Sequence, residues 1–525
     1  MTLLSTTLAL IGLWGCNDSD LIPLDKIPEY SVIYGDTIRV RNDNTVIFNK
    51  EEKSNLIFGR ESTVFGDTIV LHKGISRKYP SKAPDLSNIK KKSLPELGGL
   101  PFRMISVGGG ITAGFRDGGY FNEGIETSYP NLIAQQMKLG SFEQPKFSNT
   151  DFNGIGRKIK TNENFSGGPV PKFKGVVNNT GVETIEFTSG AFGKGEVLNA
   201  KFKKALNIER LDNWAVPNFN SSFLNPSSIV SSYDWDRDIK TNQAFIERLI
   251  KHKDEKFAEK ILDNKFDLLI YEIGFDDLLN ELLKNRYLKG ASSLPDPEVK
   301  EHFFRDYNQL QSDNLINSQT KFLRNLYDKG LKNICFLNIP AIDKLPYFNL
   351  IDQEEIRGAA ELAQTSLLFF EKDPYRASGS FEFDGSSLAI PTSGIDSLLS
   401  NKVKMALKRG LSEERPLSFN SHTKRNFVTK HLEDFNSQVA AFAELFNSPL
   451  VDVNNLYERI LKGNYITADG VIVDPSWPEG NFFSGDGIYP SAFGQAIIAN
   501  EVIRKINEHY GLNIELVSTR EMLAN

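Results

Sequence analysis

The sequence predicts an α/β protein whose main domain is built on a mostly parallel sheet. Three short apolar runs have the length and composition of buried strands, and they cover residues 103–107, 266–273 and 332–339. Longer stretches with the spacing of amphipathic helices separate these runs. Strands that alternate with helices along a chain form parallel sheets that helices cover on both faces.

The predicted elements follow one another from residue 101 onward. The first strand runs into three glycines, and a helix over 128–137 follows, with Ser128 as its N-cap and Pro130 in its first turn. The second strand ends at Gly274 and the third at Pro340, residue types that interrupt regular structure. We expect further helices over 243–263, 298–330, 425–446, 491–511 and near 353–371, and a last strand over 449–453.

The chain divides into three parts. Residues 1–15 are mostly apolar and typical of a targeting segment, so they are left out of the fold. Residues 16–100 are expected to hold a tether, a small β region and a linker. Residues 101–525 form the α/β domain, with insertions near 145–205 and 350–420 that lack sustained periodicity.

Two segments of the β region look like copies of one unit. Residues 32–40 and 63–71 each contain an aromatic-Gly-Asp-Thr sequence followed by alternating apolar residues. This alternation is typical of half-buried strands. The two copies predict a small β appendage before the main domain.

The composition is that of a globular protein. Of the 525 residues 40% are hydrophobic and 24% charged, and the net charge of -6 gives no sign of nucleic-acid binding. The chain has two cysteines, of which Cys335 lies in an apolar run and is predicted to be a buried core thiol. Two cysteines indicate neither a disulfide framework nor a cysteine-based metal site.

The N-terminal segment resembles a bacterial lipoprotein signal. Its apolar run ends at Gly15-Cys16, and residues 17–20 turn abruptly polar and acidic. In such proteins a small residue precedes a cysteine that is lipidated and becomes the mature N-terminus. The resemblance implies a lipid anchor at Cys16 that holds the protein at the bacterial outer membrane, on its periplasmic or cell-surface face.

The glycine turn after the first strand resembles the first signature block of the SGNH (GDSL) hydrolases. That block reads Gly-Asp-Ser-Leu, followed by Thr/Ser-x-Gly. Gly108 matches the first glycine, and Gly109 replaces the aspartate. Gly110 stands in place of the nucleophilic serine and Ile111 in place of the leucine, while residues 112–114 keep the Thr-Ala-Gly sequence.

The resemblance extends over residues 101–515 and is closest to the large lipid-anchored members found in Bacteroidetes-type bacteria. It implies a three-layer α/β/α fold and a site with a serine, a histidine base, an aspartate and oxyanion donors. Ala215 replaces the glycine that donates to the oxyanion, and Asp276 replaces the asparagine donor. Tyr489 replaces the histidine, and only the aspartate, Asp486, is retained.

These replacements imply that catalysis has been lost. Gly110 has no side chain to attack a carbonyl, and a phenol with an ordinary pKa of about 10 is no ready base near neutral pH. An ionised Asp276 only accepts hydrogen bonds and would repel an oxyanion, whereas Ala215 keeps a backbone N–H. We therefore expect no enzyme activity and no cofactor, but a structural or interaction subunit of an outer-membrane protein complex.

Two other functions stay open. The cleft of the lost site is a candidate for binding a glycan or an acylated ligand, lined by Phe115, Tyr120, Trp214, Phe275 and Tyr489. A weak esterase with a relocated nucleophile would use Thr112 or Ser484, although none of the six histidines occupies a signature position. The carboxylates Asp276, Asp277 and Asp486 suit a cation such as Ca²⁺, but Asp277 is more simply a helix N-cap or a hydrogen-bond acceptor.

Overall fold

The computed structural model describes the α/β domain and a set of strands outside it. The described parts of the domain are residues 79–116, 119–147, 204–227, 245–252, 254–283, 316–346, 349, 422–476, 480–484 and 487–523. Outside them, single strands are described between residues 30 and 72, at 154–155 and between 368 and 420.

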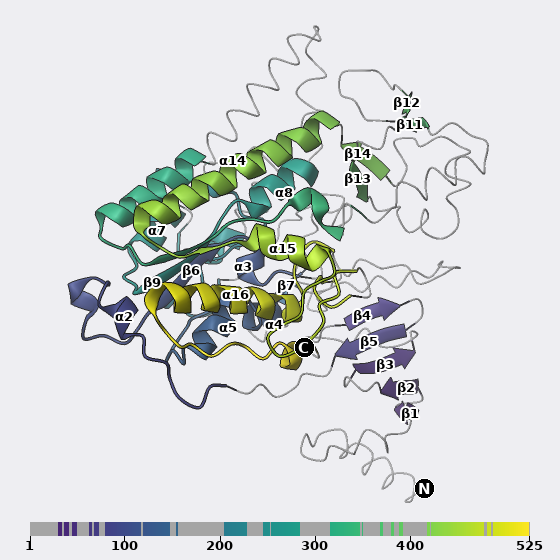
Figure 1. Ribbon diagram of the computed structural model, residues 1–525, viewed down its shortest axis with the longest axis horizontal. Helices are drawn as coiled ribbons and strands as arrows, with labels where there is room; N and C mark the ends of the chain where they lie inside the picture. Colours follow the sequence, from purple (N-terminus) through teal and green to yellow (C-terminus); the bar gives the residue numbers. More distant parts are fainter. Residues whose placement is uncertain are drawn as a thin grey trace, which may run out of the picture.

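Four parallel strands form the central sheet (Figure 1), which confirms the predicted α/β class with a mostly parallel sheet. Their order across the sheet is β15-β10-β9-β6, and every pairing between neighbours is parallel. Their bounds are β6 (Met104–Gly108), β9 (Leu268–Glu272), β10 (Ile334–Leu337) and β15 (Leu450–Val451).

Residues 212–216 run along the free side of β6. Ser106 and Asn213 form a parallel bridge, and the N–H of Trp214 donates to the carbonyl of Ser106 at 2.8 Å. The segment follows β6 in the chain but lies on the opposite side of it from β9, so the strand order reverses at β6. In open α/β sheets ligands bind beyond the carboxyl ends of the strands at such a reversal. The glycine turn after β6 therefore occupies the place where a site is expected.

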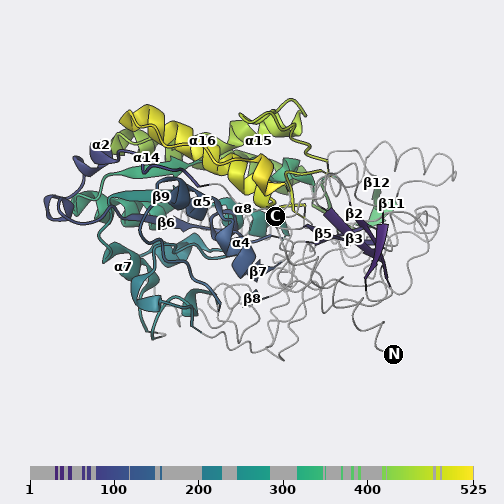
Figure 2. The ribbon, with the colours of Figure 1, turned by 90° about the horizontal axis from the view of Figure 1, so that it is seen from below.

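Helices cover both faces of the sheet (Figure 1). On one face lie α14 (His422–Phe446) and α8 (Phe275–Leu283), which contact each other. On the other face α16 (Ala492–Tyr510) packs on α5 (Tyr129–Gln136), and α15 (Val453–Leu461) lies along the same side of the domain as α16 (Figure 2).

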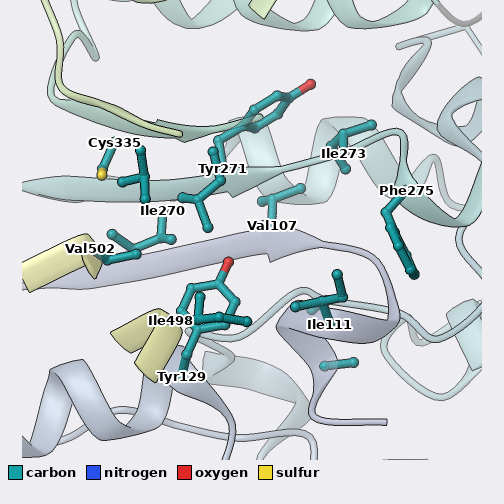
Figure 3. Packing of buried hydrophobic residues seen from close by; sticks show 14 of the residues in the cluster. Val107, Ile111, Tyr129, Ile270, Tyr271, Ile273, Phe275, Cys335, Ile498 and Val502 are labelled. Carbon is teal, nitrogen blue, oxygen red and sulfur yellow. The ribbon is translucent and has the colours of Figure 1, made fainter. Parts of the chain in front are cut away.

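The core lies between the strands and these helices. Ile498 and Val502 of α16 and Tyr129 of α5 point toward the strand residues Val107 and Ile270, and all five are at most 1% exposed (Figure 3). Burying a large aliphatic side chain of this kind contributes about 1.5–3 kcal/mol to folding. Apolar side chains on two helices and two strands therefore hold the layers together.

The predicted buried thiol is also confirmed. Cys335 is fully buried in β10, and burial raises the pKa of its thiol far above the usual range. A thiol in this state is a small apolar core group rather than a nucleophile.

A serine lies at the N-cap of each of two predicted helices, but only Ser491 caps its helix with its side chain. The Ser491 hydroxyl accepts a hydrogen bond from the N–H of Gly494 at 3.1 Å, and α16 ends at Gly511, whose φ of 64° suits glycine. Ser128 also occupies the N-cap of α5, but its hydroxyl donates to the carbonyl of Ile125 and does not cap the helix. The Gln495 side chain takes over, because its amide oxygen accepts from the N–H of Tyr129 at 2.9 Å.

The N-terminal β region forms a five-stranded antiparallel sheet in the order β1-β2-β3-β5-β4. Each predicted unit is a hairpin rather than one strand. The first is β1 (Tyr30–Ile33) with β2 (Asp36–Val40), and the second is β4 (Ser62–Phe65) with β5 (Thr68–His72). Ile38 of the first hairpin and Ile69 of the second both pair with Phe48 of β3 (Thr45–Asn49), so the two copies meet β3 in the same register.

Three predicted elements need correction. The helix expected near 353–371 is wrong at its end, because β11 (Leu368–Phe370) is a strand paired with β12 (Ser380–Glu382). Of the described residues in the helix expected over 243–263, those at 245–247 and in α7 (Phe257–Leu262) are helical, and turns lie between them. The strand expected over 449–453 is shorter, since the Asp452 carboxylate accepts from the N–H of Asn455 and starts α15.

Several expectations lie outside the described residues. These are the segment 1–15 with Cys16, the retained Asp486, and nearly all of the insertion near 145–205. The helix expected over 298–330 is described only from residue 316, where it runs to residue 328. None of the helices in the described parts of the chain is both long and apolar enough to cross a bilayer.

Candidate functional site

Three of the replaced signature residues come together where β6 ends. Gly110 opens the short helix α3 (Gly110–Ala113), Asp276 lies in the first turn of α8, and Tyr489 precedes α16. The N–H of Gly110 donates to Asp276 Oδ2 at 2.7 Å, and the hydroxyl of Tyr489 donates to Asp276 Oδ1 at 2.7 Å. The site expected from the sequence is therefore assembled in space, with Asp276 at its centre.

The phenol ring of Tyr489 fills the space beside Gly110. A Cβ atom built on Gly110 would lie 2.5 Å from Tyr489 Cε1 and 2.9 Å from both Cζ and the hydroxyl oxygen. The φ angle of Gly110 is not among the positive ones, so its backbone would accept an L-residue. The ring of Tyr489, and not the turn geometry, excludes a side chain at the serine position.

The same crowding affects the neighbouring glycine. A Cβ on Gly109, which stands at the aspartate position of the signature block, would lie 2.6 Å from Asp276 Oδ2. Contacts below 3 Å between such atoms force a rearrangement in a close-packed interior. Two consecutive glycines thus let the turn approach the Asp276 carboxylate closely.

The Asp276 carboxylate accepts hydrogen bonds from several segments at once. Besides Gly110 and Tyr489, the N–H of Phe219 donates to its Oδ2 at 2.9 Å. Burial raises the pKa of Asp276 to about 6, and the hydrogen bond from Tyr489 and those from backbone N–H groups oppose this rise. Asp276 is 2% exposed and mainly ionised at neutral pH, because its hydrogen-bond donors stabilise the charged form.

The two backbone N–H groups at the positions where the resemblance implies an oxyanion hole already donate hydrogen bonds within the protein. The Gly110 N–H, at the position of the serine N–H, donates to Asp276, and the Ala215 N–H donates to Asn213 Oδ1 at 3.0 Å. Ala215 keeps its N–H, as expected, but the side chain of Asn213 in the same loop accepts a hydrogen bond from it. Ala215 is 1% exposed and lies on the segment that runs along β6.

Glu272 supplies a second buried carboxyl group, which was not predicted from the sequence. It is the last residue of β9 and 2% exposed, and its Oε2 accepts from the N–H of Gly109 at 3.1 Å and from the Thr112 hydroxyl at 2.8 Å. Burial, and then the charge of Asp276, raises the pKa of Glu272 to about 8. The available signal was a single acidic residue at the end of an otherwise apolar strand.

The candidate relocated nucleophiles are both buried. Thr112 is fully buried, and its hydroxyl donates to Glu272 and contacts the hydroxyl of Tyr129 at 2.8 Å. Ser484 is 4% exposed, and its N–H donates to the carbonyl of Tyr489 at 2.8 Å. Thr112 therefore ties β9 to α5, and neither hydroxyl is presented to solvent.

The cation site suggested by the sequence is not assembled by the two aspartates that the structure describes. Asp277 Oδ1 accepts from the N–H of Ser221 at 3.0 Å, whereas Asp276 faces Gly110. The described residues contain no group of three or more His, Cys, Asp or Glu that would hold a metal. Asp277 thus acts as the hydrogen-bond acceptor that the simpler interpretation expected.

The aromatic residues expected to line a cleft are packed in the interior. The ring of Tyr489 contacts those of Phe115 and Phe275, with centroids 5.0 Å and 5.7 Å apart in edge-to-face geometry. The set is at most 4% exposed, and it consists of Phe115, Tyr120, Trp214, Phe275 and Tyr489. These rings stabilise the site by packing and offer no platform for a sugar.

A scan against protein-family models finds no match to the chain, and a search of the curated proteins finds none either. The geometry of the site is therefore the main guide to its function.

Proposed function

We propose that this chain is an SGNH-hydrolase-like protein, with that family's three-layer α/β/α fold, that has lost catalysis. The observation that carries the proposal is that the Tyr489 phenol occupies the space of the missing nucleophile. The order of the signature blocks and the reversal of the strand order at β6 support the same fold.

The chemistry of the site supports a loss that single changes do not reverse. Acyl transfer needs donors directed at the forming oxyanion, and removing one such donor costs about 3 kcal/mol. Here Gly110 and Ala215 donate to side chains of the protein itself, and Asp276 presents carboxylate oxygens where the family has an amide donor. An oxyanion placed there would meet a buried negative charge.

We further propose that the protein acts by association, as a lipid-anchored structural or interaction subunit of an outer-membrane complex. The lipoprotein-like N-terminus at Cys16 supports the anchor, and the long insertion near 350–420 supplies a candidate contact surface. A stable interface buries at least about 1,000 Å² in total and concentrates its energy on aromatic and arginine anchors. Residues 369–376 include such residue types.

The test is purification of the tagged protein from gently solubilised membranes. We expect a specific outer-membrane partner with the wild-type chain, and its loss when residues 368–420 are deleted. This deletion removes the paired strands β11 with β12 and β13 (Leu388–Pro391) with β14 (Leu417–Asn420) together. Gly140→Ala is the matched control, because a Cβ at this position meets nothing within 4 Å, and it should retain the partner.

One outcome would contradict the association, and another would contradict the contact surface. If wild-type protein brings down no partner while it binds a defined glycan or acylated ligand, the ligand-binding alternative replaces this proposal. If the deletion variant keeps the partner, the insertion is not the contact surface.

A further inference from the structure

Two buried carboxyl groups accept hydrogen bonds from consecutive backbone N–H groups of the glycine turn. Glu272 Oε2 accepts from the N–H of Gly109 at 3.1 Å, and Asp276 Oδ2 accepts from the N–H of Gly110 at 2.7 Å. Glu272 ends β9 and Asp276 begins α8, and both are 2% exposed. The two groups therefore fasten the end of β6 to the β9–α8 connection.

The hydrogen bonds of the two groups differ in a way that assigns the charge. Asp276 uses both oxygens, which accept from the N–H groups of Gly110 and Phe219 and from the Tyr489 hydroxyl. The backbone of Asn218 also donates to this carboxylate. Glu272 Oε1 is buried and has no hydrogen-bond partner in the described parts of the chain. Ionising Glu272 would leave a charged oxygen buried without a donor, which costs free energy, whereas the protonated carboxyl group carries no charge and is buried at a lower cost. One negative charge is thus placed on Asp276 and one proton on Glu272.

Among the described residues, the titratable groups that act on the pair give no positive charge to offset a second ionisation. Asp277 in α8 is another acid whose charge raises the Glu272 pKa. In the same part of the chain, Tyr271 of β9, Tyr129 of α5, Cys335 of β10 and Tyr489 before α16 also lie beside the pair or its partners. Burial raises the pKa values of Tyr271, Tyr129 and Cys335, so these groups stay neutral near pH 7.

We propose that Glu272 and Asp276 form a pH-sensitive joint, in which the pair carries one negative charge while Glu272 is protonated. Ionisation of Glu272 then loosens the glycine turn from the β9–α8 connection. The joint links the turn with β9 and α8, and through Tyr489 with the segment before α16, so its charge state affects the packing of both faces of the sheet.

The sign of the pH dependence follows from linkage. A carboxyl group whose pKa is raised in the folded state binds its proton more tightly there than in the open state. Its stabilising contribution is complete below the open-state pKa of about 4.5 and is lost as the pH rises to about 8. Between pH 6 and pH 8 the titration of Glu272 should therefore raise the equilibrium constant for opening about fiftyfold, and that of Asp276 should raise it about twofold, which together make about a hundredfold.

The experiment is amide hydrogen exchange of the full-length protein from pH 6 to pH 8, corrected for the intrinsic effect of pH and read on a peptide that covers the glycine turn. We expect a rise of about a hundredfold in the wild type. Glu272→Gln carries no titrating proton and should reduce the rise to about twofold, the part that Asp276 contributes. Glu458→Gln removes an exposed carboxylate from α15 and should keep the wild-type rise.

Infrared spectroscopy of the wild type gives a second measurement that needs no variant. We expect the carbonyl band of a protonated carboxylic acid at pH 7, where Asp276 is mainly ionised, and its disappearance by pH 9.5. The proposal is overturned if no such band is present at pH 7, if the wild-type opening constant does not rise, or if Glu272→Gln leaves the rise unchanged.

Discussion

Gly110→Ala should destabilise the protein strongly, although alanine normally suits a helical position better than glycine. The new Cβ would lie 2.5 Å from Cε1 of Tyr489. This ring is 3% exposed, packs between Phe115 and Phe275, and is tied to Asp276 by its hydroxyl, so it has little room to move. Overpacking costs about 1–3 kcal/mol, and losing a hydrogen bond to a charged group about 1.5–3 kcal/mol. We expect a total loss of about 3–6 kcal/mol.

The assay is a double-mutant cycle by denaturant unfolding. Tyr489→Ala alone should cost about 3–5 kcal/mol, as for other large aromatic truncations. In the double variant with Gly110→Ala the Cβ no longer meets a ring, so the combined loss should be at least about 2 kcal/mol smaller than the sum. Gly140→Ala, where a Cβ has open space, should change stability by less than about 1 kcal/mol. Additive losses within about 0.5 kcal/mol would refute the conclusion that Tyr489 fills the side-chain position of residue 110.

Three further predictions concern the charge, the chemistry and the anchor. Asp276→Asn should cost about 1–3 kcal/mol in denaturant unfolding, because the single oxygen of an amide group cannot accept from all the donors that the two carboxylate oxygens serve. The wild-type protein should neither turn over short aryl esters nor react with a fluorophosphonate, and Gly110→Ser should restore neither; labelling at Thr112 would contradict this. Cys16→Ser should move the protein from the membrane to the soluble fraction on fractionation, since stable anchoring needs the acyl chains. Unchanged membrane association would instead indicate a protein anchor.

The sequence predicted the elements whose signals are local. Three of the four central strands lie in mainly apolar runs that are followed by glycine or proline, and α16 has Ser491 before it and Gly511 after it. The predicted length of the last strand was wrong, because a helix N-cap follows its apolar residues directly. Asp452 begins α15 at once, and this leaves only two residues of β15.

The candidate site was predictable in its positions but not in its contacts. Gly110, Asp276 and Tyr489 were identified individually from a motif, as missing groups. Their mutual fit joins residues that are 166 and 213 apart in the chain, and no local pattern in a single sequence reports it. Glu272 was missed for a related reason, since a charged residue in a buried strand is interpretable only when its donors, Gly109 and Thr112, are known.

The contacts among Gly110, Asp276 and Tyr489 oppose the residues that the hydrolase motif has at these positions. A serine at position 110 would meet the ring of Tyr489, and an amide at position 276 would leave backbone donors without an acceptor. A histidine at position 489 would remove the hydroxyl that Asp276 accepts from. Each single substitution toward that motif therefore costs stability, and in a protein of ordinary marginal stability such substitutions are selected against. Gly110, Asp276 and Tyr489 are therefore coupled by packing and hydrogen bonds. The Asp276 carboxylate holds them together, and the hydrolase motif has an asparagine in its place.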